Sequence, residues 1–87
     1  MRNEKIIIVD DVSIFRMDLK DMLTHEGYEV IAEANNGEKA VELAHQFRPD
    51  LIIMDVKMPK MDGLKASKII KRQYQIPIVL LTAYSDP

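Results

Sequence analysis

Four short apolar runs, separated by segments with helical periodicity, constrain the fold of this chain more than any other feature. The runs that we expect to form strands cover residues 5–9, 28–34, 50–54 and 77–81. The segments between them repeat apolar side chains every three or four positions, as amphipathic helices do, and cover residues 12–26, 38–47 and 64–73. Because the connections are short and crossovers are right-handed, this order predicts a parallel sheet with helices on both faces.

Turn-forming and capping residues mark the ends of the expected helices. Gly27 follows the first helix, where glycine adopts a left-handed conformation without steric cost. Either Asn35 or Asn36 is placed to cap the second helix, and Pro49 ends it. Asp62 is expected to cap the third helix.

Composition narrows the class of protein. A chain of 87 residues forms one domain at most. Its net charge of −2 provides no basic surface for nucleic acid, so we expect no direct nucleic-acid binding. It has no cysteine for disulfides or thiolate metal sites, a polar start unlike a signal peptide, and no apolar run long enough to cross a bilayer. We therefore expect a cytoplasmic location without membrane association.

Acidic residues directly follow two of the expected strands. Asp10 and Asp11 come after the first, and Asp55 comes after the third. In a sheet of strand order 2-1-3-4 these two strands are central neighbours, and their carboxyl ends meet at the crevice where such sheets bind ligands. Helix capping is the simplest role for an aspartate here, but it accounts for only one of a tandem pair. Converging carboxylates raise each other's pKa, and a hard divalent cation such as Mg²⁺ relieves the repulsion.

Two further positions belong to the same expected edge of the sheet. Thr82 ends the fourth strand, so its hydroxyl should lie beside Asp55 and could donate a hydrogen bond to an incoming phosphoryl oxygen. The loop after Asp55 contains Lys57, Pro59 and Gly63. Pro59 and Gly63 are either ordinary loop residues or they shape the loop so that the backbone carbonyl of Lys57 turns towards the metal.

The first helical segment has two apolar faces. One stripe is expected to face the core and contains Val12, Phe15, Leu19, Met22 and Leu23. Ile14 and Met17 lie roughly opposite that stripe. They are either scattered exposed apolar residues or a face on which a partner protein docks beside the acidic site.

Four motifs together resemble the receiver domain of bacterial two-component response regulators. They are IIVDD ending at Asp11, PDLIIMD ending at Asp55, MPKMDG over 58–63 and PIVLLTA over 77–83, and the similarity runs through the whole chain in order. The resemblance implies a three-layer, flavodoxin-like fold. It also implies a signalling domain, not an enzyme, in which Asp55 accepts a phosphoryl group from a sensor histidine kinase or a phosphotransfer protein.

The same resemblance implies the cofactor and the roles of the site residues. Mg²⁺, or Mn²⁺ in its place, would be held by Asp10 or Asp11, by Asp55 and by the backbone carbonyl of Lys57. Thr82 would contact the phosphoryl group. If the second apolar face of the first helical segment is a docking face, the kinase would dock near Ile14 and Met17.

The chain also departs from the receiver pattern. Receivers have a final helix, strand and helix, with a characteristic lysine and an aromatic switch residue on the strand; we expect residues 1–87 to form about two thirds of a receiver. Segments 62–68 and 80–86 resemble receivers that precede an RNA-binding antitermination (ANTAR) domain, which suggests transcription regulation or antitermination as the output. The unpaired edge at 76–81 predicts a dimer or a domain swap.

Two other classes of protein share parts of this pattern. A phosphatase of the haloacid dehalogenase type also has a nucleophilic aspartate after an apolar strand, but it needs a second aspartate where this chain has Lys57. A flavodoxin-like flavin-binding module needs a hydroxyl- and glycine-rich loop where this chain has Asp10 and Asp11. Both remain alternatives to the receiver.

Overall fold

The computed structural model describes residues 4–82, and its elements alternate as the sequence predicts. The strands are β1 (Lys5–Val9), β2 (Glu29–Ala34), β3 (Leu51–Asp55) and β4 (Ile78–Leu81). The helices are α1 (Ser13–His25), α2 (Gly37–Phe47) and α3 (Gly63–Gln73). Within residues 4–82, no helix is long and apolar enough to cross a bilayer.

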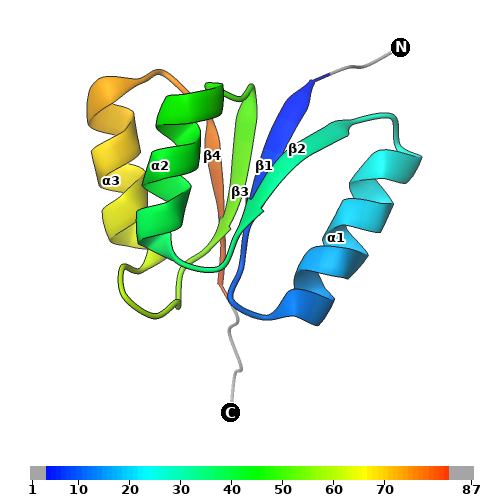
Figure 1. Cartoon of the computed structure of the whole chain (residues 1–87), viewed down its shortest axis with the longest axis horizontal. Coiled ribbons are helices and arrows are strands. Elements are labelled where there is room, and N and C mark those ends of the chain that lie inside the picture. The colour runs from blue at the N-terminus through cyan, green and yellow to red at the C-terminus, as the bar shows by residue number, and fades with distance from the viewer. Residues whose placement is uncertain (1–3, 83–87) are drawn as a thin grey trace.

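The four strands form one parallel sheet in the order β2-β1-β3-β4, which confirms the predicted order (Figure 1). Val9 of β1 is paired with Met54 of β3, and Asp55 of β3 is paired with Leu81 of β4. This register brings the carboxyl ends of β1, β3 and β4 to one edge of the sheet. The residues that follow those strands therefore share that edge.

The helices divide between the two faces of the sheet, with α2 and α3 on one face and α1 on the other (Figure 1). Side chains of the central strands alternate between the faces, so Ile7 and Ile52 enter one core cluster while Ile6 and Ile53 enter the second. The cluster under α2 and α3 is the larger, and it includes Ala40, Ala44, Ala66 and Ile70. Burial on both faces explains why β1 and β3 are almost uninterrupted runs of isoleucine and valine or leucine.

Only part of the predicted stripe on α1 packs against the sheet. Leu19 and Leu23 contact the smaller core cluster, whereas Met22 and Phe15 are exposed, Phe15 by 57%. No residue of α1 is fully buried. The prediction of a fully buried stripe is therefore wrong, because α1 packs over β1 and β2 and leaves part of its apolar side without a neighbour in the described chain.

The outer strand β4 packs against a core cluster on one face only, where its side chains are partly buried. Ile78 and Leu80 pack into the cluster under α2 and α3. Val79 and Leu81 point to the face of α1 and are 46% and 40% exposed. Among residues 4–82, α1 is the helix on that face, and it lies over the opposite half of the sheet.

The predicted caps are confirmed. Gly27 follows α1 with a φ of 94°, in the left-handed region. Asn36, and not Asn35, caps α2, because its side chain accepts a 2.9 Å hydrogen bond from the backbone N–H of Lys39. Asp62 caps α3 through a 2.8 Å bond from the N–H of Lys65. These bonds fix where the two helices begin, and hence where the loops before them end.

Candidate functional site

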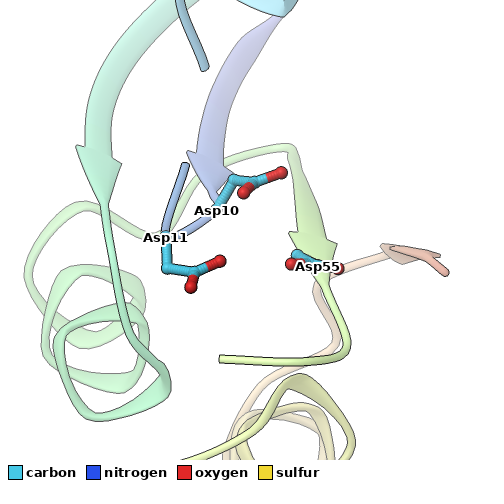
Figure 2. A group of neighbouring side chains, drawn as sticks. All are labelled: Asp10, Asp11 and Asp55. Carbon is cyan, nitrogen blue, oxygen red and sulfur yellow. The ribbon is translucent and has the colours of Figure 1, made fainter. Parts of the chain in front are cut away.

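Three carboxylates converge at the carboxyl edge of the sheet (Figure 2). Asp10 and Asp11 follow β1, and Asp55 is the last residue of β3. One carboxylate oxygen from each of the three lies within 4.8 Å of the others. The carboxylates of Asp11 and Asp55 face the same gap between the two strand ends (Figure 2). The convergence expected from the strand order is therefore present in the structure.

Backbone and side-chain hydrogen bonds hold the first of these aspartates in place. The N–H of Asp10 donates to the carbonyl of Ala34 at 3.0 Å, which extends the pairing of β1 with β2 by one residue. The Asp10 carboxylate accepts a 2.9 Å hydrogen bond from the N–H of Val12, just before α1. Asp10 therefore closes a local turn before α1 and still contributes to the acidic cluster. It does not cap the helix, because Val12 is the N-cap residue and α1 has no side-chain cap.

Burial and the neighbouring carboxylates both shift the pKa of Asp55. Burial raises the pKa of Asp55, and the neighbouring charge of Asp10 raises it further, with a smaller effect from Asp11. Hydrogen bonds from the backbone N–H groups of Lys57 and Val56 lower the pKa in part. A divalent cation between these oxygens would favour the ionised form of Asp55. Hard oxygen donors in this number suit Mg²⁺, so the residues present fit that ion.

The acidic cluster opens into a cavity of about 420 Å³. Its lining residues are Asp10, Asp11, Val12, Phe15, Asp55, Lys57, Leu81 and Thr82. The structure therefore brings all five of the predicted site residues around one cavity. Ala83, the next residue of the fourth motif, lies outside the described residues. Ile14 and Met17 do not line the cavity in the described part of the chain; they are exposed on α1 nearby.

Sequence reasoning missed Phe15 as a residue of this cavity. Helical periodicity placed Phe15 on the stripe that faces the core, but its ring lies with Val12 and Leu81 in the apolar wall. The periodicity identifies the correct side of α1 and says nothing about how far along the sheet that side is covered. Phe15 lies in the first turn of α1, close in sequence to the end of β1, and this nearness is the one signal that could have placed it at the strand end.

Arg16 is a second residue that the sequence did not single out. Its guanidinium donates a 2.6 Å hydrogen bond to the backbone carbonyl of Asp10 and a 3.2 Å bond to the carboxylate of Glu33. Lys20 lies 3.4 Å from the same carboxylate. Arg16 thereby fastens the first turn of α1 to the ends of β1 and β2. The sequence gives only a weak signal for Arg16, because only the tertiary fold brings its partners, Asp10 and Glu33, close to it.

The loop after Asp55 is held by close backbone contacts. The N–H of Val56 donates to the carbonyl of Leu81 at 3.0 Å, and the N–H of Gly63 donates to the carbonyl of Val56 at 2.8 Å. A Cβ atom on Gly63 would lie 2.1 Å from the backbone oxygen of Asp55. Gly63 is therefore required by close packing against the backbone of Asp55.

The parallel sheet order and the helices on both faces define a flavodoxin-like α/β domain, and its acidic cluster lies at the strand ends where such sheets bind ligands. Residues 6–87 match the response regulator receiver domain family. The chain belongs to this family, whose members are phosphoacceptor signalling domains of two-component systems. This confirms both the fold and the family expected from the four motifs, and it disfavours the phosphatase and flavin-binding alternatives.

Individual relatives agree with this assignment. The transcriptional regulatory protein PdtaR of Mycobacterium tuberculosis is 51% identical over 82 residues, which cover 94% of this chain and 40% of PdtaR. The response regulator domain of Thermotoga maritima CheB has a TM-score of 0.92 at 31% identity, covering 98% of this chain and 64% of that one. The Borrelia burgdorferi CheX–CheY–BeF₃–Mg²⁺ complex has a TM-score of 0.87 at 29% identity, covering 95% and 64%. The chain thus spans about two fifths of the length of PdtaR.

Proposed function

We propose that Asp55 accepts a phosphoryl group from the phosphohistidine of a sensor histidine kinase or a phosphotransfer protein. The observation that carries this proposal is the position of Asp55 at the end of β3, with its carboxylate within 4.8 Å of two others and facing an open cavity. A carboxylate oxygen of Asp55 forms a bond to phosphorus while the phosphorus–nitrogen bond of the donor breaks. The electron pair of that bond remains on the imidazole nitrogen.

The cation belongs to the same proposal. Asp10, Asp11 and Asp55, together with the backbone carbonyl of Lys57, would hold Mg²⁺, and Mn²⁺ also accepts such oxygen ligands. When bound, the ion offsets the negative charge that the carboxylates and the incoming phosphoryl oxygens bring together. Thr82 also lines the cavity, and its hydroxyl can donate a hydrogen bond to a phosphoryl oxygen. Asp55 must be ionised to act, so its raised pKa makes the reaction sensitive to acid.

The partner surface proposed for the kinase is the exposed side of α1 at Ile14 and Met17, which are 55% and 59% exposed. Both residues lie in the first two turns of α1, next to the residues that line the cavity. A partner that covers them would lie within reach of Asp55. The Borrelia burgdorferi CheY, seen in a complex with CheX, BeF₃ and Mg²⁺, supports the kind of ligands proposed for this site.

The output of the signal is a proposal about the whole protein. Since PdtaR is a transcriptional regulatory protein, we propose that this receiver domain controls transcription or antitermination, in the cytoplasm and through a separate ANTAR-type output region. The described segment would not itself bind nucleic acid or membrane, and it would not turn over a substrate. Exposed Val79 and Leu81 at the outer strand favour the dimer or domain swap through 76–81.

Beryllofluoride binding tests the proposed site directly. With Mg²⁺ present, beryllofluoride should bind at Asp55 and raise the thermal midpoint of the protein, because it binds only the folded state. Asp11→Asn should weaken this shift, whereas Asp18→Asn, which removes a carboxylate from the exposed surface of α1, should leave it unchanged. An unchanged midpoint in the wild-type protein would contradict the site. Turnover of phosphate esters would instead indicate the phosphatase alternative.

A further inference from the structure

The first N–H group of α2 makes its hydrogen bond outside its own helix. Gly37 donates to the backbone carbonyl of Met61 at 2.8 Å. The leading N–H groups of a helix have no partner within the helix, and the capping side chain of Asn36 serves Lys39. The carbonyl of Met61 therefore satisfies a donor at the start of α2, and it joins the turn before α2 to the loop after Asp55.

This contact leaves no room for a side chain on Gly37. A Cβ atom there would lie 2.2 Å from the backbone oxygen of Met61 and 2.8 Å from its carbonyl carbon. Both atoms belong to the backbone, so a side-chain rotation cannot relieve the overlap. Gly37 is itself buried. The requirement for glycine comes from close approach of two backbone segments, one of the uses for which glycine is suited.

The loop between Asp55 and α3 is held at two places, and Lys57 lies between them. At its base, Val56 and Gly63 are joined by a 2.8 Å hydrogen bond. At its far side, Met61 accepts the bond from Gly37 and donates its own N–H to the carbonyl of Pro59 at 2.8 Å. A displacement of Met61 would therefore pass along the loop towards Lys57, whose carbonyl is a proposed ligand.

We propose that Gly37 is a positioning residue for the cation site. Its N–H group and its lack of a side chain hold the loop of residues 56–62 in the conformation that places Lys57 at the cavity with the three carboxylates. Gly37 acts through Met61 and does not touch the cation. The inference rests on the proposed function, since it assumes that Mg²⁺ binds at Asp10, Asp11 and Asp55.

The test compares Mg²⁺ affinity in Gly37→Ala and Gly27→Ala, measured by titration of the full chain with Mg²⁺ and followed by NMR chemical shifts. Gly27→Ala is the matched control: it makes the same substitution and strains a residue with a φ of 94°, but just before the start of β2, at the other end of the sheet. We expect the dissociation constant for Mg²⁺ to rise by about 10- to 100-fold in Gly37→Ala, as for other residues that orient metal ligands. Gly27→Ala should keep wild-type affinity, although we expect urea unfolding to show that it is less stable than the wild type.

Wild-type affinity for Mg²⁺ in Gly37→Ala would overturn this inference and leave the proposed function standing. An equal loss in both variants would also overturn it, because affinity would then follow general stability. A wild-type protein that does not bind Mg²⁺ would overturn the proposed function, and the inference with it.

A second measurement covers the case in which Gly37→Ala does not fold. Coupling between two sites is reciprocal, so Mg²⁺ should strengthen the bond from Gly37 to Met61. In the wild-type protein, saturation with Mg²⁺ should slow hydrogen exchange of the Gly37 N–H more than that of Lys39, which bonds to Asn36 in the same turn. Equal changes at Gly37 and Lys39 would overturn the inference.

Discussion

The backbone oxygen of Asp55 and the α-carbon of Gly63 lie so close together that a Cβ on Gly63 would stand 2.1 Å from that oxygen. The carbonyl carbon of Asp55 and the α-carbon of Val56 would both lie 3.0 Å from the same Cβ. The start of α3 is thus packed directly against the backbone of the proposed phosphoacceptor. The first residue of α3 must therefore be glycine, because any side chain there would overlap the backbone at the end of β3.

Gly63→Ala should destabilise the protein. Overpacking of this kind costs about 1–3 kcal/mol, whereas alanine is otherwise the better helix former by up to about 1 kcal/mol. A loss of stability in Gly63→Ala would therefore be opposite to the effect of helix propensity, and we would attribute it to the overlap with Asp55. Urea unfolding provides the measurement, with Leu64→Ala, an exposed neighbour in the same turn, as the control. A Gly63→Ala protein more stable than the wild type would contradict the contact.

Asp55→Asn should stabilise the metal-free protein at neutral pH. The pKa of Asp55 is raised in the folded state, so the folded state favours the protonated carboxyl group. The associated stability is present at low pH and is lost as the pH rises through the folded-state pKa. A chelator keeps the protein free of metal in this experiment. The thermal midpoint of Asp55→Asn should then exceed that of the wild type at about pH 7, and the difference should shrink towards about pH 4.

The control for this pH dependence is Asp18→Asn, on the exposed surface of α1. It should not reproduce the pattern, since Asp18 lies outside the acidic cluster. A difference between Asp55→Asn and wild type that grows as the pH falls would show that the sign assigned to Asp55 is wrong.

Met17→Glu should slow phosphotransfer from the cognate kinase while leaving phosphorylation by a small phosphodonor intact. A charge in the centre of an apolar contact should reduce the rate by about tenfold, the equivalent of about 1.4 kcal/mol of lost partner binding. Time courses with both donors provide the measurement. Gln46→Glu adds the same charge on α2 and should affect neither reaction. Equal losses with both donors would show that Met17→Glu damages α1 and not the docking face.

The 87-residue chain should associate through β4 and the exposed face beside it. Strand β4 lies at the edge of the sheet in residues 4–82, and Val79 and Leu81 are exposed there. Sedimentation at several concentrations should show species larger than 10.0 kDa, and Val79→Lys should reduce them. Gln73→Lys, which adds the same charge on α3, should have no such effect. A monomer at every concentration would refute the association.

The fold and the acidic cluster could be predicted from the sequence because both follow from local patterns. The apolar runs fix the strands, and the parallel order brings Asp10, Asp11 and Asp55 to one edge whatever the details of packing. The place of Phe15 could not be predicted, because a helical stripe shows which side of α1 faces the sheet and not which part of the sheet it covers.

Contacts between distant segments account for the rest. Arg16 reaches the carbonyl of Asp10 and the carboxylate of Glu33, and Gly37 reaches the carbonyl of Met61. Neither pair is marked by spacing along the chain. Gly63 shows an intermediate case: the sequence marks a glycine in the loop, but only the packed structure shows that the backbone of Asp55 excludes any side chain there.

Phosphorylation of Asp55 is the central claim, and mass spectrometry of the intact protein tests it most directly. After incubation with Mg²⁺ and a small-molecule phosphodonor, the wild-type protein and Asp21→Asn should each gain one phosphoryl group. Asp55→Asn should gain none, because it removes the carboxylate that we propose as the acceptor in this cavity. A phosphoryl group on Asp55→Asn at the wild-type level would contradict the account.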